Sequence, residues 1–315
     1  MTRLIEQYDS LIVDADGVIY RGAIAVPHAI EVLGSVSVPW CVLTNNAALP
    51  PSSIAERIER LGLPLDPVNV VTSPQGAVAY LRERGLPEGA PILIVGGSGI
   101  DEAVSEAGFT PVRDRAAQPQ AVVQGLGMEV GWRELSEAGY AIAAGAMWVV
   151  TNVDASLPTE QGFALGNGAL VAAVQHAIGQ APDVVTGKPE PLLFHLAADR
   201  MGATRPLVLG DRLDTDVRGA NSAGMDSLLV LTGVAGADEL MHLIDADPLE
   251  RPTYIAEDLR ALDGSADLVR VDTDAPGSGP LPEVRRGLGR AWSHSDVPGN
   301  VRDEVRQAID TWARR

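Results

Sequence analysis

Cysteine and basic residues are scarce in this sequence. Among its 315 residues only Cys41 is a cysteine, so the chain cannot form an internal disulfide, a pattern typical of intracellular proteins. Lysine and arginine together number 24 against 42 aspartates and glutamates, which gives a formal net charge of −18. Nucleic acids and anionic membrane surfaces repel such a chain, because both are polyanions. We therefore expect a cytoplasmic protein with no nucleic-acid or membrane partner.

Long hydrophobic runs are also missing. The longest apolar stretch, residues 138–150, contains two glycines and is shorter than the ~18 residues that a membrane-spanning helix needs. Residues 1–9 include Glu6 and Asp9 and have no apolar core, which argues against a signal peptide. Overall, 46% of the residues are hydrophobic and 21% are charged, an ordinary balance for a globular protein. The composition thus excludes a disordered or membrane-embedded chain.

Short apolar runs alternate with helical patterns along the chain. Several runs are continuously apolar, as expected for strands buried on both faces of a parallel sheet. Many helical patterns end at a glycine, the usual C-terminal stop of a helix. This alternation predicts an α/β fold with a doubly wound, Rossmann-like parallel sheet. We expect strands at residues 10–13, 40–43, 91–95, 121–123, 147–150, 207–209, 227–231 and 253–255, and helices at 53–61, 75–84, 132–143, 168–178, 191–201 and 301–312.

Two aspartates, Asp14 and Asp16, follow the first expected strand, and Gly17 permits a sharp exit of the chain. Residues i and i+2 of an extended segment point the same way, so both carboxylates can face one site. Open α/β sheets bind ligands at the carboxyl ends of their strands. Two neighbouring acids suit a division of labour between an ionised nucleophile or metal ligand and a protonated acid. The competing interpretation is a plain turn, in which aspartate is favoured.

Two further motifs offer groups that could hold phosphate. The strand at 40–43 runs into Thr44, Asn45 and Asn46, whose hydroxyl and backbone N–H groups can bind phosphate oxygens. Lys188 is fixed between a glycine and a proline and could supply the cation that an anionic substrate needs in this acidic chain. Taken alone, each has a plainer explanation, a strand-ending loop for the first and a surface lysine for the second.

Three acids, Asp211, Asp214 and Asp216, come directly after the strand at 207–209. Clustered carboxylates repel one another unless a cation lies between them, and Mg²⁺ prefers oxygen ligands. Capping of a following helix could explain one or two of the acids, but hardly Asp211 as well. The fourth motif therefore indicates a magnesium site.

Together and in this order, the four motifs resemble those of the haloacid dehalogenase-like (HAD) hydrolase superfamily, across roughly residues 10–235. Asp-x-Asp-Gly-Val-x-Tyr, Thr-Asn-Asn, Gly-Lys-Pro and Gly-Asp-x-x-x-Thr-Asp look like the subfamily of NagD-type and p-nitrophenyl phosphatases. The segments 122–126, 166–168 and 210–216 are similar to those of actinobacterial glycerol-3-phosphate phosphatases. No single residue, however, specifies glycerol phosphate.

The resemblance implies a role for each motif. Asp14 would attack phosphorus and form an aspartyl-phosphate, and Asp16 would protonate the leaving alcohol and later activate water. Thr44 and Lys188 would hold the phosphoryl oxygens, with Asn45 and Asn46 in the same loop. The Asp14 side chain, the Asp16 backbone carbonyl and the Asp211 side chain would bind Mg²⁺, and Asp216 would act through a bound water or by supporting these ligands without contacting the metal.

The spacing of the motifs locates an inserted domain. Asp14 and Thr44 are only 30 residues apart, whereas Thr44 and Lys188 are 144 apart, far more than one crossover requires. We therefore expect an α/β cap domain of the C2 type between them, a position that argues against sugar-phosphate mutases. The expected division is residues 1–72 and 184–262 for the catalytic core, 73–183 for the cap and 263–315 for a small C-terminal extension.

The cap should exclude water and select the leaving group. Candidate selectivity residues are Met128, Glu129 and Trp132, although these residues could simply begin the helix at 132–143. Asn152 and Asp154 follow another strand and are expected near the cleft, with turn formation as the alternative.

The leading hypothesis is a Mg²⁺-dependent phosphatase of a small phosphorylated metabolite, with glycerol 3-phosphate as the first choice. A NagD-type phosphatase of nucleotides or other sugar phosphates is the alternative among enzymes. A third possibility is a non-catalytic binding module on the same fold. Such a module would not need Asp16, so the presence of Asp16 in this sequence argues against it. Relatives often dimerise through the cap, so the resemblance leaves a homodimer open.

Overall fold

The computed structural model describes residues 2–159 and 161–315. Its internal contacts divide the chain into two compact units. The first unit comprises Met1–Leu43, Ile58–Leu65 and Ala197–Arg315, and the second comprises Thr44–Arg57 and Asp66–Leu196. Each unit holds its own parallel sheet, which confirms the α/β fold class that the sequence predicts. The finer division into core, cap and extension stays a prediction.

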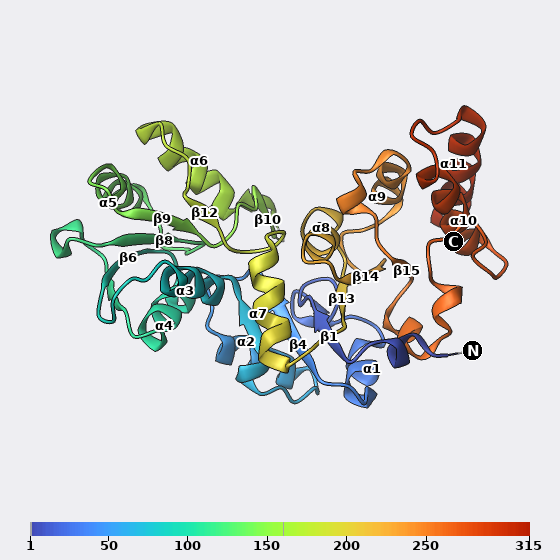
Figure 1. The fold of residues 1–315 in the computed structure, drawn as a ribbon, viewed down its shortest axis with the longest axis horizontal. Helices are drawn as coiled ribbons and strands as arrows, with labels where there is room; N and C mark the ends of the chain where they lie inside the picture. The colour runs from blue at the N-terminus through green and yellow to red at the C-terminus, as the bar shows by residue number, and fades with distance from the viewer. Residues whose placement is uncertain (1, 160) are drawn as a thin grey trace. The chain divides into compact units, whose positions relative to one another are not determined.

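The sheet of the first unit carries its strands in the order β15, β14, β13, β1 and β4, and every pair of neighbours is parallel. β1 lies between β13 and β4, so the chain leaves β1 on one side and returns on the other (Figure 1). Such a reversal of strand order opens a ligand-binding crevice at the carboxyl ends of the strands. The bounds are Ser10–Val13 for β1, Trp40–Thr44 for β4, Pro206–Gly210 for β13, Asp226–Val230 for β14 and Tyr254–Ala256 for β15.

Short helices and turns connect these strands. A two-stranded hairpin of β2 (Tyr20–Arg21) and β3 (Ile24–Ala25) follows β1. The helices of the first unit are α1 (Ala29–Ser35), α8 (Arg218–Ser222), α9 (Ala237–His242), α10 (Pro280–Trp292) and α11 (Gly299–Ala313), and a π-helical turn, η4, spans Leu213–Val217. Cys41 is fully buried in β4, and burial raises the pKa of its thiol to about 12, which agrees with a structural role for this cysteine.

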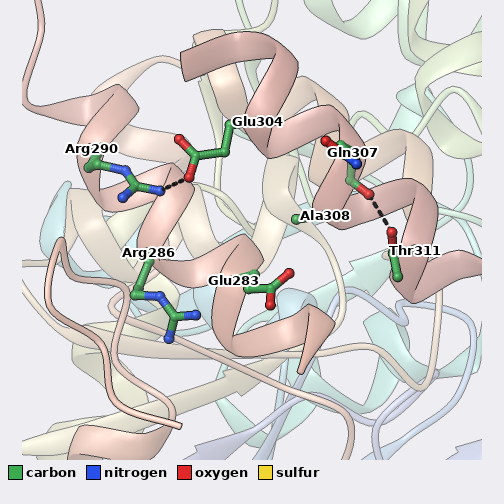
Figure 2. Close-up of a pocket in the computed structure, with 7 residues that line it drawn as sticks. All are labelled: Glu283, Arg286, Arg290, Glu304, Gln307, Ala308 and Thr311. Carbon is green, nitrogen blue, oxygen red and sulfur yellow. Dashed lines mark hydrogen bonds and ion pairs between the residues drawn. The ribbon is translucent and has the colours of Figure 1, made fainter. Parts of the chain in front are cut away.

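Helices α10 and α11 pack onto the sheet instead of forming a separate body. Leu288 of α10 and Ile309 of α11 share one buried cluster with Leu229 of β14 and Ile255 of β15. The buried Arg285 donates a hydrogen bond from Nη1 to the Ile255 carbonyl oxygen at 2.8 Å. A pocket of about 300 Å³ lies between the two helices. Its lining residues, drawn in Figure 2, are Glu283, Arg286, Arg290, Glu304, Gln307, Ala308 and Thr311.

The second unit is built on a parallel sheet with the order β12, β9, β8, β6 and β7. Side chains alternate across it, as the pleat of a strand requires. In β6, Ile92 and Ile94 face a buried cluster that includes Leu81 and Val104, whereas Leu93 faces one that includes Ile142 and Val174. The strands are β6 (Pro91–Val95), β7 (Thr110–Val112), β8 (Ala121–Gln124), β9 (Met147–Val150) and β12 (Val184–Val185).

Helices cover both faces of this second sheet. Helices α3 (Ser73–Glu83) and α4 (Ser98–Glu106) contribute to the first cluster, and α5 (Trp132–Ala143) and α6 (Asn167–Ile178) to the second. The remaining elements are α2 (Pro51–Arg60), β5 (Val70–Thr72), α7 (Pro191–Met201) and the antiparallel pair β10 (Ser156–Thr159) and β11 (Gly162–Leu165). Among the described residues, no helix is long and apolar enough to cross a bilayer.

Candidate active site

Asp14 and Asp211 lie at the carboxyl ends of two neighbouring strands. Asp14 directly follows β1, and its backbone N–H donates to the Leu209 carbonyl oxygen of β13 at 2.9 Å. Asp211 directly follows β13. Because the two strands are parallel and paired from Ser10 to Val13, their ends bring both side chains to one edge of the sheet.

The Asp211 side chain is buried and held by the loop after β14. Its Oδ2 accepts a hydrogen bond from the Val234 N–H at 2.6 Å, and its carbonyl oxygen accepts one from the Ala235 N–H at 2.9 Å. A Cβ atom at Gly17 or at Gly233 would overlap the Asp211 carboxylate. Gly17 also has a φ of +83°, a conformation that favours glycine. Glycines on two loops therefore make room for this carboxylate.

Asp216 lies in the π-helical turn η4, which follows β13 and leads directly into α8. Its Oδ2 accepts a hydrogen bond from the Arg212 N–H at 3.2 Å, and a side chain at Gly210 would overlap it. Asp214 of the same turn takes a different direction, because it pairs with Arg212 at 2.7 Å and is 61% exposed. The turn thus separates the two acids, with Asp216 buried and Asp214 facing solvent.

Asp14, Asp211 and Asp216 together form a carboxylate cluster. Each offers a carboxylate oxygen within 4.8 Å of the other two, and all three residues are buried. Three buried like charges at this separation repel strongly unless a cation compensates them. An all-oxygen donor set matches the preference of hard cations such as Mg²⁺. The residues present therefore fit the magnesium site that the fourth sequence motif indicates.

Asp16 differs from Asp14 in its surroundings. It is exposed, and its backbone forms an isolated bridge with Tyr20 at the start of the hairpin. Asp14 by contrast is only 9% exposed. Asp14 is thus packed into the carboxylate cluster, whereas Asp16 is open to solvent. The expected contact of the Asp16 carbonyl with a metal stays a prediction.

In the second unit, Asn45 and Lys188 are joined by a pair of hydrogen bonds. The Asn45 Oδ1 accepts from the Lys188 N–H at 2.8 Å, and the Asn45 Nδ2 donates to the Lys188 carbonyl oxygen at 3.0 Å. A side chain at Gly187 would overlap the Thr151 carbonyl oxygen and press on Asn45. Lys188 itself is 5% exposed. The asparagine after β4 thus fixes the backbone of the lysine.

Four other polar residues belong to this network around Asn45. The Asn152 Nδ2 and the Ser73 Oγ both donate to the Asn45 carbonyl oxygen, at 2.9 and 3.0 Å. The Asn167 Nδ2 donates in turn to the Asn152 carbonyl oxygen at 2.6 Å. Asp154 lies at the edge of the network, with its Oδ2 3.4 Å from the Asn45 Nδ2. The structure thus brings the predicted residues Asn45, Asn152, Asp154 and Lys188 together.

Thr44 and Asn46 form a compact turn at the end of β4. The Thr44 Oγ1 accepts from the Asn46 N–H at 3.1 Å, and the Asn46 Oδ1 accepts from the N–H groups of Ala48 and Leu49. Both side-chain oxygens therefore stabilise the turn before α2. Their contacts with a substrate stay a prediction.

The cap candidates Met128, Glu129 and Trp132 lie between β8 and the first turn of α5 and are all exposed. Trp132 is 81% exposed and is the first residue of α5, as the simpler interpretation of the sequence requires. The structure shows no contact that joins this group to the Asn45 network among the described residues. Their part in selectivity stays a prediction.

Sequence reasoning missed Ser73, Asn167 and Gly233 as parts of the site. Ser73 and Asn167 are buried polar residues, and both begin helices, α3 and α6. The glycines on either side of Asn167 were a usable signal, because a Cβ at Gly166 or Gly168 would overlap the backbone after Asn152. Gly233 carries no sequence signal, since only its closeness to Asp211 reveals its role.

Comparison with known proteins identifies the family. A model of haloacid dehalogenase-like hydrolases matches residues 11–110, and a second model, of HAD-hydrolase-like sequences, matches residues 185–262. A D-glycerol 3-phosphate phosphatase of Mycobacterium tuberculosis is 42% identical over 297 residues, which cover 94% of this chain and 82% of that protein. The chain belongs to the haloacid dehalogenase-like hydrolases.

Two more similar proteins agree with this assignment. The crystal structure of a glycerol phosphate phosphatase of M. tuberculosis in complex with magnesium has a TM-score of 0.90 and 37% identity, and covers 99% of both chains. An acid sugar phosphatase of Staphylococcus haemolyticus is 31% identical over 260 residues, which cover 81% of this chain and 95% of that protein. Within the haloacid dehalogenase-like hydrolases, the chain is therefore a phosphatase.

Proposed function

We propose that this phosphatase depends on Mg²⁺ and hydrolyses a small phosphomonoester, with glycerol 3-phosphate as its first candidate substrate. The carboxylate cluster of Asp14, Asp211 and Asp216 carries the proposal, because it lies where the motifs of the family predict a catalytic nucleophile and a metal site. The candidate substrate rests on the 42% identity with the D-glycerol 3-phosphate phosphatase.

Asp14 is the proposed nucleophile. One of its carboxylate oxygens would attack phosphorus, the bond from phosphorus to the leaving oxygen would break, and an aspartyl-phosphate would form. Its position at the end of β1, with the backbone N–H held by Leu209, gives the backbone that carries the carboxylate a fixed place. Such preorganisation supports in-line attack, because the group does not have to be ordered during the reaction.

Asp16 is the proposed general acid and base. In the first step it would donate a proton to the leaving alkoxide, and in the second it would take a proton from the water that attacks the aspartyl-phosphate. The solvent exposure of Asp16 supports this role, since the same carboxyl must reach both the alcohol and the water. Its exposed setting differs from the buried setting of Asp14, as two acids with separate tasks require.

Thr44 and Lys188 are the proposed phosphate ligands. Lys188 would supply positive charge to the phosphoryl oxygens in a chain with a net charge of −18. Stabilising charge on the transferred group provides most of the catalysis in phosphoryl transfer. The bidentate contact of Asn45 with the Lys188 backbone supports the assignment, because it fixes the segment from which the ammonium group extends.

Asp14, Asp211 and Asp216 would hold the Mg²⁺. When bound, the cation would neutralise negative charge on the phosphoryl oxygens and on the three carboxylates. Val234 and Arg212 orient two of these ligands through backbone N–H groups. The resemblance implies that Asp216 acts through a bound water, whereas its place in the cluster supports direct binding as well.

The test is phosphate release by the purified protein, with and without Mg²⁺, from a panel of phosphomonoesters. We expect turnover only with Mg²⁺ and the highest kcat/KM for glycerol 3-phosphate. A preference for nucleotides or for other sugar phosphates would support the NagD-type alternative, which the similarity to an acid sugar phosphatase favours. No release from any ester, p-nitrophenyl phosphate included, would refute the proposed activity.

We propose a cytoplasmic enzyme, which the single, buried cysteine supports.

The α/β body that contains β6 to β9 is proposed as the cap, and its two buried clusters support an independent folding unit. A homodimer through this cap stays a prediction, and sedimentation analysis would test it.

A further inference from the structure

Two helices extend from the segments that carry the carboxylate cluster. Asp216 lies in η4, and α8 begins with Arg218 directly after that turn. The Asp211 carboxylate is held by Val234, and α9 begins three residues later at Ala237. A displacement of α8 would therefore move Asp216, and a displacement of α9 would move the loop that holds Asp211.

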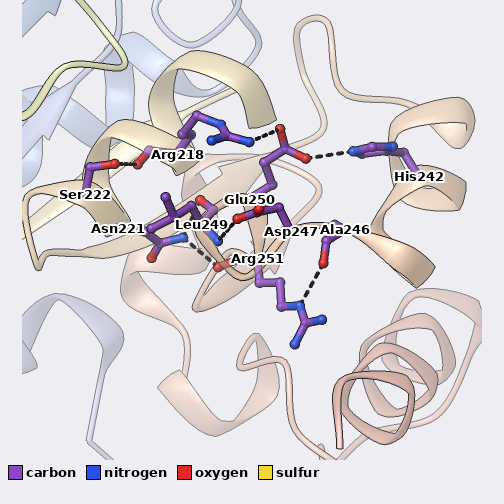
Figure 3. Close-up of polar contacts among 9 residues, drawn as sticks. All are labelled: Arg218, Asn221, Ser222, His242, Ala246, Asp247, Leu249, Glu250 and Arg251. Atoms are coloured by element: carbon purple, nitrogen blue, oxygen red, sulfur yellow. Dashed lines mark hydrogen bonds and ion pairs between the residues drawn. The ribbon is translucent and has the colours of Figure 1, made fainter. Parts of the chain in front are cut away.

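Glu250 bridges these two helices. Its Oε1 accepts a hydrogen bond from the Arg218 Nη2 at 2.9 Å, and its Oε2 lies 2.7 Å from the His242 Nε2 at the end of α9 (Figure 3). The Glu250 side chain is only 14% exposed, although its partners reach solvent. One carboxylate thus ties the helix after Asp216 to the helix after the Asp211 loop.

The segment around Glu250 is itself fixed to α8. The Asn221 Nδ2 donates to the carbonyl oxygens of Leu249 and Arg251, at 2.8 and 3.0 Å, and so holds the residues on either side of Glu250. Asp247 caps this short turn by accepting from the Leu249 N–H at 2.8 Å. Burial acts to raise the pKa of Glu250, but hydrogen bonds from His242 and Arg218 outweigh it and lower that pKa. Glu250 is therefore held as an ionised bridge.

We propose that Glu250 is a positioning residue for the metal site, which it serves by fixing α8 and α9 relative to each other. This inference rests on the proposed Mg²⁺ site. Glu250 touches none of the three cluster carboxylates in the described structure; it acts through Arg218 on the turn of Asp216 and through His242 on the helix that follows Val234. Its contribution lies in keeping the carboxylates at the separation that a divalent cation requires.

The effect should appear in metal binding more than in stability. Partly exposed ion pairs contribute little to folding, whereas residues that couple a distant contact to a binding site change affinity by about 2- to 30-fold. We therefore expect Glu250→Ala to raise the Kd for Mg²⁺ by about 2- to 30-fold, measured by calorimetry without substrate. In metal-free protein, the N–H groups of Asp216 and Val234 should exchange with solvent faster than in the wild type.

Asp258→Ala is the matched control. Asp258 is 12% exposed, pairs with Arg260 and caps a turn of the same unit, but it contacts neither α8 nor α9. Asp258→Ala should lower the melting temperature by about as much as Glu250→Ala does. It should leave the Mg²⁺ affinity and the solvent exchange of the Asp216 and Val234 N–H groups unchanged. His242→Ala removes one arm of the bridge at a side chain that is 58% exposed, so the variant should fold. It should weaken Mg²⁺ binding less than Glu250→Ala does.

Each result decides the proposal. Wild-type Mg²⁺ affinity in both Glu250→Ala and His242→Ala would overturn it, as would equal weakening in Asp258→Ala. Should Glu250→Ala fail to fold, the affinity of His242→Ala decides alone. If the wild-type protein itself does not bind Mg²⁺, the proposed metal site is refuted. The positioning role of Glu250 is refuted separately if the N–H groups of Asp216 and Val234 exchange at the wild-type rate in the variants.

Discussion

The Asn45 side chain and the Lys188 backbone form a two-point contact between residues 143 positions apart in the chain. The amide group of asparagine satisfies both backbone polar groups of one residue, the N–H and the carbonyl oxygen of Lys188. This contact fixes the direction in which the chain enters and leaves Lys188. Its value to the enzyme is therefore positional, since Asn45 need not touch the substrate to affect it.

Replacing Asn45 should impair catalysis through Lys188. Asn45→Ala removes both hydrogen bonds, and a misplacement of ~1 Å in a catalytic group can lower the rate by about 10²-fold. We expect kcat/KM to fall toward that limit. Asn45→Asp keeps the acceptor for the Lys188 N–H but loses the donor to the Lys188 carbonyl oxygen. Its kcat/KM should therefore lie between those of the wild type and Asn45→Ala. Steady-state kinetics on p-nitrophenyl phosphate provides the measurement, and an unchanged kcat/KM in Asn45→Ala would contradict the assignment.

Asp14→Asn should abolish turnover. The amide is a poor nucleophile, and no other residue of the motif can replace the carboxylate. Acid-quenched samples of the wild type should contain protein-bound phosphate, and samples of the variant should contain none. Asp214→Asn is the control, because Asp214 is exposed and paired with Arg212 and should retain activity. A folded Asp14→Asn protein with more than a few percent of wild-type activity would remove Asp14 from the mechanism.

Asp16→Asn should separate substrates by their leaving groups. A glycerol alkoxide needs a proton, so its release should slow by the ~10²–10⁴-fold typical of general acid catalysis. A p-nitrophenolate leaves without help, so formation of the aspartyl-phosphate from that ester should slow less. The intermediate should then accumulate, since water attack also loses its base. Single-turnover measurements on both esters test this, and equal slowing of both first steps would show that Asp16 is not the leaving-group acid.

Asp9 should contribute to stability in a pH-dependent way. Burial acts to raise its pKa, but hydrogen bonds from Thr204, Arg205 and Ser10 lower the pKa to about 2. Because the folded pKa lies below the unfolded value, the stabilisation is present above pH ~4 and is lost as the pH falls toward 2. Asp9 is exposed, so we expect at most about 1 kcal/mol.

Urea unfolding at pH 5 and at pH 2.5 measures this contribution. The free energy of unfolding should fall less between these pH values in Asp9→Asn than in the wild type. Asp296→Asn, at a side chain that is 97% exposed, should behave as the wild type does. An identical pH dependence in all three proteins would show that the hydrogen bonds to Asp9 do not couple its protonation to folding.

The strand-end residues were predictable from the sequence because parallel strands impose their own geometry. Once the runs before Asp14 and Asp211 are recognised as strands, their carboxyl ends must meet at one edge if the strands are neighbours. The hydrogen bonds of Asn45 were not predictable, because side chain to backbone contacts between distant segments leave no periodic pattern. Spacing alone leaves Asp214 and Asp216 equivalent, although the family resemblance points to Asp216. In the structure, the π-helical turn sends Asp216 into the cluster and Asp214 to solvent.

Helix α10 shows a different limit of sequence reasoning. Residues 275–282 contain three prolines and two glycines, and the sequence pattern predicts only one helix after them, at 301–312. Pro280 and Pro282 instead occupy the first turn of α10, where proline costs no hydrogen bond. The cluster that joins Leu288 to Ile255 depends on tertiary packing and could not be foreseen from local pattern.

The central place of β1 in its sheet has a consequence for biosynthesis. Ser10 pairs with Pro206, so 196 residues must follow the first strand from the ribosome before its partner exists. At ~5–20 residues per second, that delay is about 10–40 s. During this time one edge of β1 has no strand beside it, and an unpaired edge can join the strand of another nascent chain. A chaperone that shields residues 10–13 on the ribosome would therefore raise the yield of folded enzyme.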